Sequence, residues 1–198
     1  CLGQVVFTRL VTSLGTTVFA AHSIALTAEE AFYIPGYGMQ SAATTLTGNA
    51  IGARDEKKLK HTSSLLILLS FAFMTITGSL LFLLATQMMQ LFTPDAEVIR
   101  LGASALRIVA LSEPVFGISI ILEGIFNGAG DTRHPFLYSL FSMWGIRIVG
   151  TFLCVHFFQL GLNAVWLCMV ADNVCRGILL AIRYRRHNLM PISISENQ

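Results

Sequence analysis

The feature that most constrains this chain is a run of about thirty residues without a charge, which extends from Thr62 to Thr93. A helix needs only about twenty apolar residues to cross the hydrocarbon core of a bilayer. Helices that pack on a soluble core keep a polar face toward water, whereas this run is apolar around its whole circumference. The run therefore predicts a membrane-spanning helix, and a lipid bilayer is the expected environment of the chain.

The composition agrees with a membrane protein. Charged residues make up 12% of the chain and hydrophobic residues 54%, and the mean hydropathy is +0.68. This charged fraction is about half of what soluble proteins carry. The net charge of only +2 and the lack of a basic stripe with interleaved aromatics argue against a nucleic-acid partner. The four cysteines lack metal-ligand spacing, so we expect no metal site, no disulfide framework and no cofactor.

Turn signals divide the chain into six predicted transmembrane helices. The expected fold class is an all-α integral membrane bundle of six helices, covering residues 1–186 and followed by a cytoplasmic tail at 187–198. The sequence opens in mid-helix without Met or a signal peptide, so we expect a fragment whose first helix is truncated. The predicted spans are Leu2–Ser13, Val18–Ile51, His61–Phe92, Val98–Phe126, Pro135–Phe158 and Leu162–Arg183.

Basic residues are distributed unequally between the two ends of these helices. Short loops on the cytoplasmic side of a membrane carry the excess of Lys and Arg. One end has eight basic residues and the other only Arg100, which predicts a multi-pass cell-membrane protein with its C-terminus in the cytoplasm. The eight are Arg54, Lys57, Lys58, Lys60, Arg133, Arg183, Arg185 and Arg186.

The second and fourth predicted helices end in similar octamers. Residues 48–55 read GNAIGARD and residues 124–131 read GIFNGAGD, both at a predicted cytoplasmic end. Small residues four apart let helices approach closely, and the later glycine, Gly52 or Gly128, can close a helix in the left-handed conformation. With Ala53, Asp55 and Asp131 these glycines form two candidate loop motifs, typical of transporters built from related helical units.

Several charged side chains lie at membrane depth, where each costs at least about 2.5–3.5 kcal/mol if it faces lipid. Asp172 and Arg176 are four residues apart on one helix face, so we expect a structural ion pair between them. Arg107 and Glu123 lie toward the ends of the fourth span, where snorkelling explains them. Arg9 and Arg147 lie deeper and require carboxylate partners.

Three glutamates precede helix breakers. Glu29 and Glu30 stand before Pro35-Gly36, and Glu113 directly precedes Pro114. Proline removes the hydrogen bond to the carbonyl four residues back, and an acid beside such a free carbonyl is how a small-cation or protonation site is assembled. The alternative is a kink with a hydrogen-bonded buried acid. His22 is a candidate proton relay, against the alternative of a packed histidine.

These residues carry a resemblance to a known family. Residues 3–55 resemble the seventh and eighth helices of multidrug and toxic compound extrusion (MATE) transporters, and Leu106–Pro135 resembles the tenth helix and its loop. The recurring elements are Gly3-Gln4, Leu14-Gly15-Thr16, Ala20-Ala21-His22, Pro35-Gly36, the AATTL of residues 42–46, Gly52-Ala53 and the GAGDT of residues 128–132.

The resemblance implies a fold and an activity. MATE proteins have twelve helices in two six-helix lobes around a cleft, and they exchange Na⁺ or H⁺ for cationic, lipophilic small molecules. This chain resembles the C-terminal lobe, whose partner is the missing N-terminal six-helix lobe. Some members carry an essential acid in the first helix of this lobe, where this chain has Gln4 and Arg9. The candidate binding residues are Glu29, Glu30, Glu113, Gln4 and His22.

Three other functions compete with a drug antiporter. A lipid-linked precursor flippase of the same superfamily would need a larger and more basic cavity, and a non-transporting membrane subunit is the third option. Paired glutamates also occur in CAAX-type intramembrane proteases, but those need an Arg soon after the pair, where this chain has AFYIP. Neither H-E-x-x-H nor G-x-S-x-G occurs, so we expect no enzyme.

Overall fold

The computed structural model describes residues 2–186, and in this range every regular element is helical. This confirms the predicted all-α fold; the predicted tail at 187–198 lies outside the described residues. Two segments, η1 and η2, are π-helical. The elements are α1 (Leu2–Thr12), α2 (Thr16–Gly52), α3 (Glu56–Phe92), α4 (Ala96–Ala110), α5 (Glu113–Gly128), α6 (Arg133–Ser142), η1 (Met143–Ile148), α7 (Val149–Phe152), η2 (Leu153–Phe157) and α8 (Leu162–Arg186).

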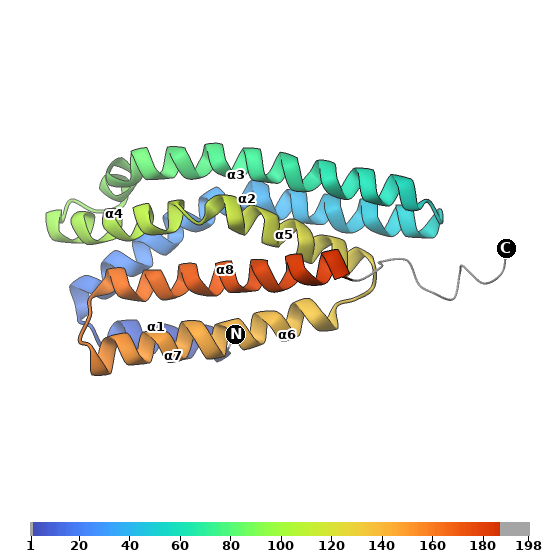
Figure 1. Ribbon diagram of the computed structural model, residues 1–198. Coiled ribbons are helices and arrows are strands. Elements are labelled where there is room, and N and C mark those ends of the chain that lie inside the picture. Colours follow the sequence, from blue (N-terminus) through green and yellow to red (C-terminus); the bar gives the residue numbers. More distant parts are fainter. Residues whose placement is uncertain (1, 187–198) are drawn as a thin grey trace.

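The helices lie side by side as a bundle (Figure 1). Each of the six predicted spans corresponds to one helical rod, with α4 and α5 forming the fourth and α6 through η2 the fifth. Tight loops join the rods, and aspartates begin two of them: the Asp55 carboxylate accepts from Lys58 N at 2.8 Å, and that of Asp95 accepts from Glu97 N at 2.9 Å. Asp95 thus caps α4, where a side chain that accepts from the free backbone N–H groups of the first turn is favoured.

The outer face of α3 is strongly apolar. Leu68, Ile76 and Leu83 are each more than 60% exposed, and a continuous apolar surface of this size is unfavourable in water. By length and apolarity α3, the α6–η2 rod and α8 qualify as membrane spans, and α4 with α5 qualifies as a fourth, broken one. Helix α2 is long enough but fails on apolarity, since it carries acids and a run of small polar residues.

The fourth predicted span is not one helix. It breaks at Leu111–Ser112, and α4 and α5 meet at 57°. Proline at the second position of α5 fits here because the first turn of a helix needs no donor at that nitrogen. Pro35, in contrast, lies inside α2, which continues to Gly52 and bends along its length (Figure 1).

The second octamer packs against the turns of α2 that lead into the first octamer. A Cβ on Gly128 would lie 2.3 Å from the Thr44 carbonyl oxygen, and one on Gly124 would lie 2.6 Å from the Gln40 carbonyl oxygen. A Cβ on Gly48 would lie 3.5 Å from the Gly128 carbonyl oxygen. The small-residue spacing therefore does predict a close helix contact, between α2 and α5.

The helix ends within the two octamers share one hydrogen-bond pattern. Ala53 N donates to Asn49 O and Asp55 N to Ala50 O, while Ala129 N donates to Ile125 O and Asp131 N to Phe126 O. The prediction that Gly52 and Gly128 close the helices was wrong. The left-handed residues come two positions later, at Arg54 (φ 56°) and Gly130 (φ 81°), because both helices continue through their glycine.

The interior consists of two apolar clusters. One gathers α1, the first half of α2, the end of α3, α4 and the first half of α8; the other gathers the later part of α2, the first half of α3, α5 and the end of α8. The two meet near the middle of α2, at the level of the α4–α5 break. The candidate site lies at this junction.

Candidate functional site

Two glutamates are buried near the α4–α5 break. Glu29 is 2% exposed and Glu113 1% exposed. The Tyr33 hydroxyl, one turn later on α2, donates to Oε1 of Glu29. Within residues 2–186 Oε2 of Glu29 and both carboxylate oxygens of Glu113 have no hydrogen-bond partner. Since an unpaired buried acid is costly, these groups are suited to take up a proton or a cation.

The break fixes Glu113 against α3. A Cβ on Gly78 would lie 2.8 Å from Cβ of Glu113 and 2.9 Å from the Ala110 carbonyl oxygen. Glycine at position 78 therefore lets α3 approach the kink closely. Ala110 O is the carbonyl that Pro114 was predicted to leave free, and it lies beside the acid in the same contact.

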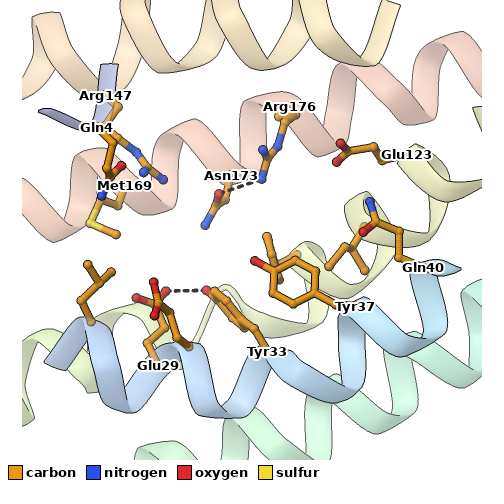
Figure 2. A pocket seen from close by; sticks show the side chains of 14 residues that line it. Gln4, Glu29, Tyr33, Tyr37, Gln40, Glu123, Arg147, Met169, Asn173 and Arg176 are labelled. Atoms are coloured by element: carbon orange, nitrogen blue, oxygen red, sulfur yellow. Dashed lines mark hydrogen bonds between the residues drawn. The ribbon is translucent and has the colours of Figure 1, made fainter. Parts of the chain in front are cut away.

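A cavity of about 430 Å³ opens between α1, α2, α5, η1 and α8. Glu29, Glu30 and the two tyrosines come from α2, and Glu123 comes from α5. Figure 2 shows Arg147 and Arg176 across the cavity from Glu29 and Tyr33, with Glu123 on the side of Arg176. Apolar surface comes from Leu26, Phe116, Ile120 and Met169. The polar lining residues are Gln4, Glu29, Glu30, Tyr33, Tyr37, Gln40, Glu123, Arg147, Asn173 and Arg176.

A buried ion pair supports the basic wall. Nε of Arg147 lies 2.8 Å from Oδ2 of Asp172 as an ion pair without hydrogen-bond alignment, and the Ser142 hydroxyl donates to Oδ1 of Asp172. The Arg147 guanidinium also lies 5.6 Å from the ring centroid of Phe7. The expected carboxylate partner of Arg147 is therefore Asp172.

The predicted ion pair between Asp172 and Arg176 is wrong. The Arg176 guanidinium donates to Ser139 Oγ at 3.1 Å and to Asn173 Oδ1 at 3.2 Å, while Asp172 is engaged by Arg147. The π-helical turn η1 carries Arg147, and its wider coil changes which side chains face α8. A contact between two elements thus replaces the local contact that helical spacing favours.

The other predicted residues divide between the cavity and the core. Gln4, Glu29 and Glu30 line the cavity, whereas Glu113 does not. His22 is 2% exposed and lies edge-on to the rings of Phe7 and Trp166. Its surroundings are those of a packed core histidine. Arg9 is exposed and forms no ion pair within residues 2–186, contrary to the expected carboxylate partner.

Among the polar residues that line the cavity, sequence reasoning did not identify Tyr33, Tyr37, Gln40 and Asn173. A signal for Tyr33 was present, because it follows Glu29 by four residues and therefore shares its helix face. Its ring also stacks on Phe116, with 4.3 Å between the centroids. For Asn173 the neighbouring Asp172 and Arg176 drew the interpretation to a local pair.

Asp131, in the loop between α5 and α6, does not line this cavity and ties that loop to α8. Asp131 accepts from Nε and Nη2 of Arg183, at 3.1 and 2.8 Å, and lies 2.6 Å from Nδ1 of His134. Burial would raise the pKa of Asp131, but the hydrogen bonds from His134 and Arg183 outweigh burial, and its pKa lies below the ordinary 3.8. Within residues 2–186 no group of three or more potential metal ligands comes together.

Residues 1–153 match the model of the MatE family. The chain is 28% identical over 177 residues to a probable multidrug resistance protein NorM from Thermotoga maritima, an alignment that covers 89% of this chain and 38% of that protein. It is 33% identical over 178 residues to the multidrug resistance protein NorM from Burkholderia vietnamiensis, covering 86% of this chain and 38% of that one. The chain thus spans about two fifths of the length of these relatives.

Solved structures show the same fold. A MATE crystal structure in a bent conformation superposes with a TM-score of 0.88 at 16% identity, covering 100% of this chain and 44% of that one. A MOP superfamily transporter from Pyrococcus furiosus, described as having a binding pocket of reverse polarity that suggests a different function, superposes with a TM-score of 0.85 at 23% identity, covering 93% and 42%. At these identities the likeness speaks for the fold alone, which corresponds to about two fifths of each of those chains.

Proposed function

The chain belongs to the MatE family, and on this premise we propose that it forms the C-terminal lobe of a secondary active multidrug efflux antiporter. The complete protein would export cationic, lipophilic compounds in exchange for Na⁺ or H⁺. Names of relatives such as NorM support drug export. An aligned length of only 38% of those relatives supports a second lobe as the partner.

The observation that carries the proposal is the acidic and aromatic wall of the cavity. Glu29, Glu30 and Glu123 line it together with Tyr33 and Tyr37. A lipophilic cation gains from carboxylates and from aromatic faces, and both attractions strengthen where water is excluded. A volume of about 430 Å³ is in the range of small-molecule sites.

Release requires that the acids lose their charge. Glu29 has one oxygen bonded to Tyr33 and one without a partner in the described part of the chain, so a proton or Na⁺ has a vacant oxygen to bind. Neutralisation would remove the attraction for the drug. Coupling further requires that the two ligands prefer different conformations, and the break between α4 and α5 offers a joint at the level of these acids.

We test this with Glu29→Gln. The variant should abolish ion-driven efflux, because the amide keeps the size of the side chain but carries no charge to titrate. Glu97→Gln, an exposed acid in the first turn of α4, is the matched control and should transport normally. Normal efflux by a well-expressed Glu29→Gln protein would remove Glu29 from the mechanism.

A lipid-linked precursor flippase is the weaker alternative. Such a substrate carries phosphates, and this cavity presents three carboxylates against two arginines, one of which is already paired with Asp172. Drug export suits this balance of charge better. We further propose that the end of the bundle with eight basic residues faces the cytoplasm.

A further inference from the structure

One arginine in the cavity has no anionic partner in the structure. Arg147 is paired with Asp172, and Arg183 is paired with Asp131. Within the described part of the chain, Arg176 donates to two neutral oxygens, those of Ser139 and Asn173. Within residues 2–186 no carboxylate lies within 4.0 Å of its guanidinium, and its Nε is buried without a hydrogen bond.

This guanidinium faces the cavity. Figure 2 shows it on the α8 wall, opposite the wall that carries Tyr33 and Glu29. Its Cζ lies 6.0 Å from the centroid of the Phe116 ring, which gives the charge an aromatic contact but no neutralisation. Asn173, 4% exposed, accepts from Arg176 through Oδ1, and Figure 2 shows its amide nitrogen turned toward the cavity.

A cationic group at membrane depth is costly unless an anion accompanies it. Glu30 and Glu123 line the same cavity, and Figure 2 shows Glu123 on the side of Arg176, but within the described residues neither acid lies within 4.0 Å of its guanidinium. A guanidinium and an amide N–H₂ side by side present donors in the arrangement that binds a carboxylate. The position for the missing anion is therefore the cavity itself.

We propose that Arg176 and Asn173 form a subsite for the carboxylate of the transported compound. The substrate class is then a zwitterionic amphiphile, with its amine toward Glu29 and its carboxylate toward Arg176. This inference rests on the proposed function and refines it. It makes Arg176 a residue that sets specificity between compounds of the same size and shape.

The test compares two forms of one rhodamine dye, the free carboxylate and its methyl ester. Both carry the cationic xanthylium ring, and they differ only in the anionic group. Binding to the purified protein, expressed from its whole gene, is followed by fluorescence polarisation, and efflux is followed in membrane vesicles. Arg176→Gln should weaken binding of the free carboxylate about tenfold or more, as expected for a lost charge-assisted contact, and leave the ester nearly unchanged.

Two further variants test whether Arg176 binds the carboxylate of the substrate or instead acts through Glu123. Arg176→Lys keeps the charge and should restore part of the preference for the carboxylate. Glu123→Gln removes the acid that lines the same cavity near α8 and should leave the preference intact. If Glu123→Gln reproduces the loss seen with Arg176→Gln, the arginine serves that glutamate and the subsite is refuted.

The outcomes also separate this inference from the proposed function. A wild-type protein that exports the ester, with Arg176→Gln changing both dyes equally or neither, overturns the subsite and leaves the efflux function standing. A wild-type protein that binds and exports neither dye speaks against the efflux function, and the subsite falls with it.

Discussion

Arg54 and Gly130 occupy equivalent positions at two helix ends with the same hydrogen-bond pattern. Only Gly130 is suited to the left-handed backbone that this position requires. Both have a positive φ, and an L-residue other than glycine pays about 1–2 kcal/mol for a left-handed backbone. We predict that Arg54→Gly raises the melting temperature of the protein in detergent and adds about 1 kcal/mol to its free energy of unfolding. The reciprocal change, Gly130→Ala, should lower both; a stabilising Gly130→Ala would contradict the argument.

The ties of Asp131 predict a pH dependence. Because the folded pKa of Asp131 lies below its ordinary 3.8, the carboxylate stabilises the fold above that pH. This stability is lost as the pH falls through the folded pKa, where protonation breaks the bonds to Arg183. Thermal melts between pH 7 and about pH 3 should therefore show a smaller acid-induced loss for Asp131→Asn than for wild type. Equal losses would mean that other acids carry the effect.

The charges at membrane depth show what a sequence reveals at the residue scale. That Glu29 and Arg147 must be shielded followed from the cost of a charge in lipid, which depends only on residue type and position along a span. Which groups shield them did not follow, because Asp172 has a favourable local neighbour in Arg176 and a better one across the bundle in Arg147. The sequence shows that Asp172 and Arg176 are four residues apart, but it does not show the tertiary contact between Asp172 and Arg147.

At the scale of elements, the contact between α2 and α5 depends on glycine. A methyl group on Gly128 would overlap the Thr44 carbonyl oxygen at 2.3 Å. We predict that Gly128→Ala costs about 1–3 kcal/mol of stability, since backbone cannot move aside as a flexible side chain can. The matched control is Gly52→Ala at the corresponding position of the first octamer, where no atom lies within 4 Å.

Gly52→Ala should be neutral or raise the stability by up to about 1 kcal/mol, because alanine favours the helix. Unfolding in detergent, measured by circular dichroism, distinguishes the two variants. Similar effects of both substitutions would show that helix propensity, and not the contact between α2 and α5, sets the result.

The elements themselves were largely readable from hydropathy and turn residues. The limits of α2 agree with the prediction to within two residues at each end, because Gly15 and the Ala53–Asp55 turn end the helical backbone there. Two features of the helices were not predicted from the sequence. The fourth span breaks into two helices where a kink was expected at Pro114, and the fifth contains π-turns at η1 and η2, which depend on packing against α8 and leave no composition signal.

For the whole molecule, the bundle has two unlike ends. The loops at 53–55 and 129–132 and the end of α8 gather at one end, as the Asp131–Arg183 pair requires (Figure 1). All eight basic loop residues are found there, while the opposite end has Arg100 beside Asp95 and Glu97. The six-rod fold thus turns a pattern spread over the sequence into one charged face.

This face predicts the orientation of the protein in the membrane. Lys58→Cys, in the first turn of α3, should be shielded from a membrane-impermeant maleimide in intact cells and react after the membrane is opened. Glu97→Cys, at the opposite end, should react in intact cells. The background is a protein without other cysteines, with efflux measured to show that it still works. The reverse labelling pattern would place the basic end outside the cell. The cavity lined by Glu29 would then have to take up its substrate from the membrane side opposite to the one that the proposed export requires.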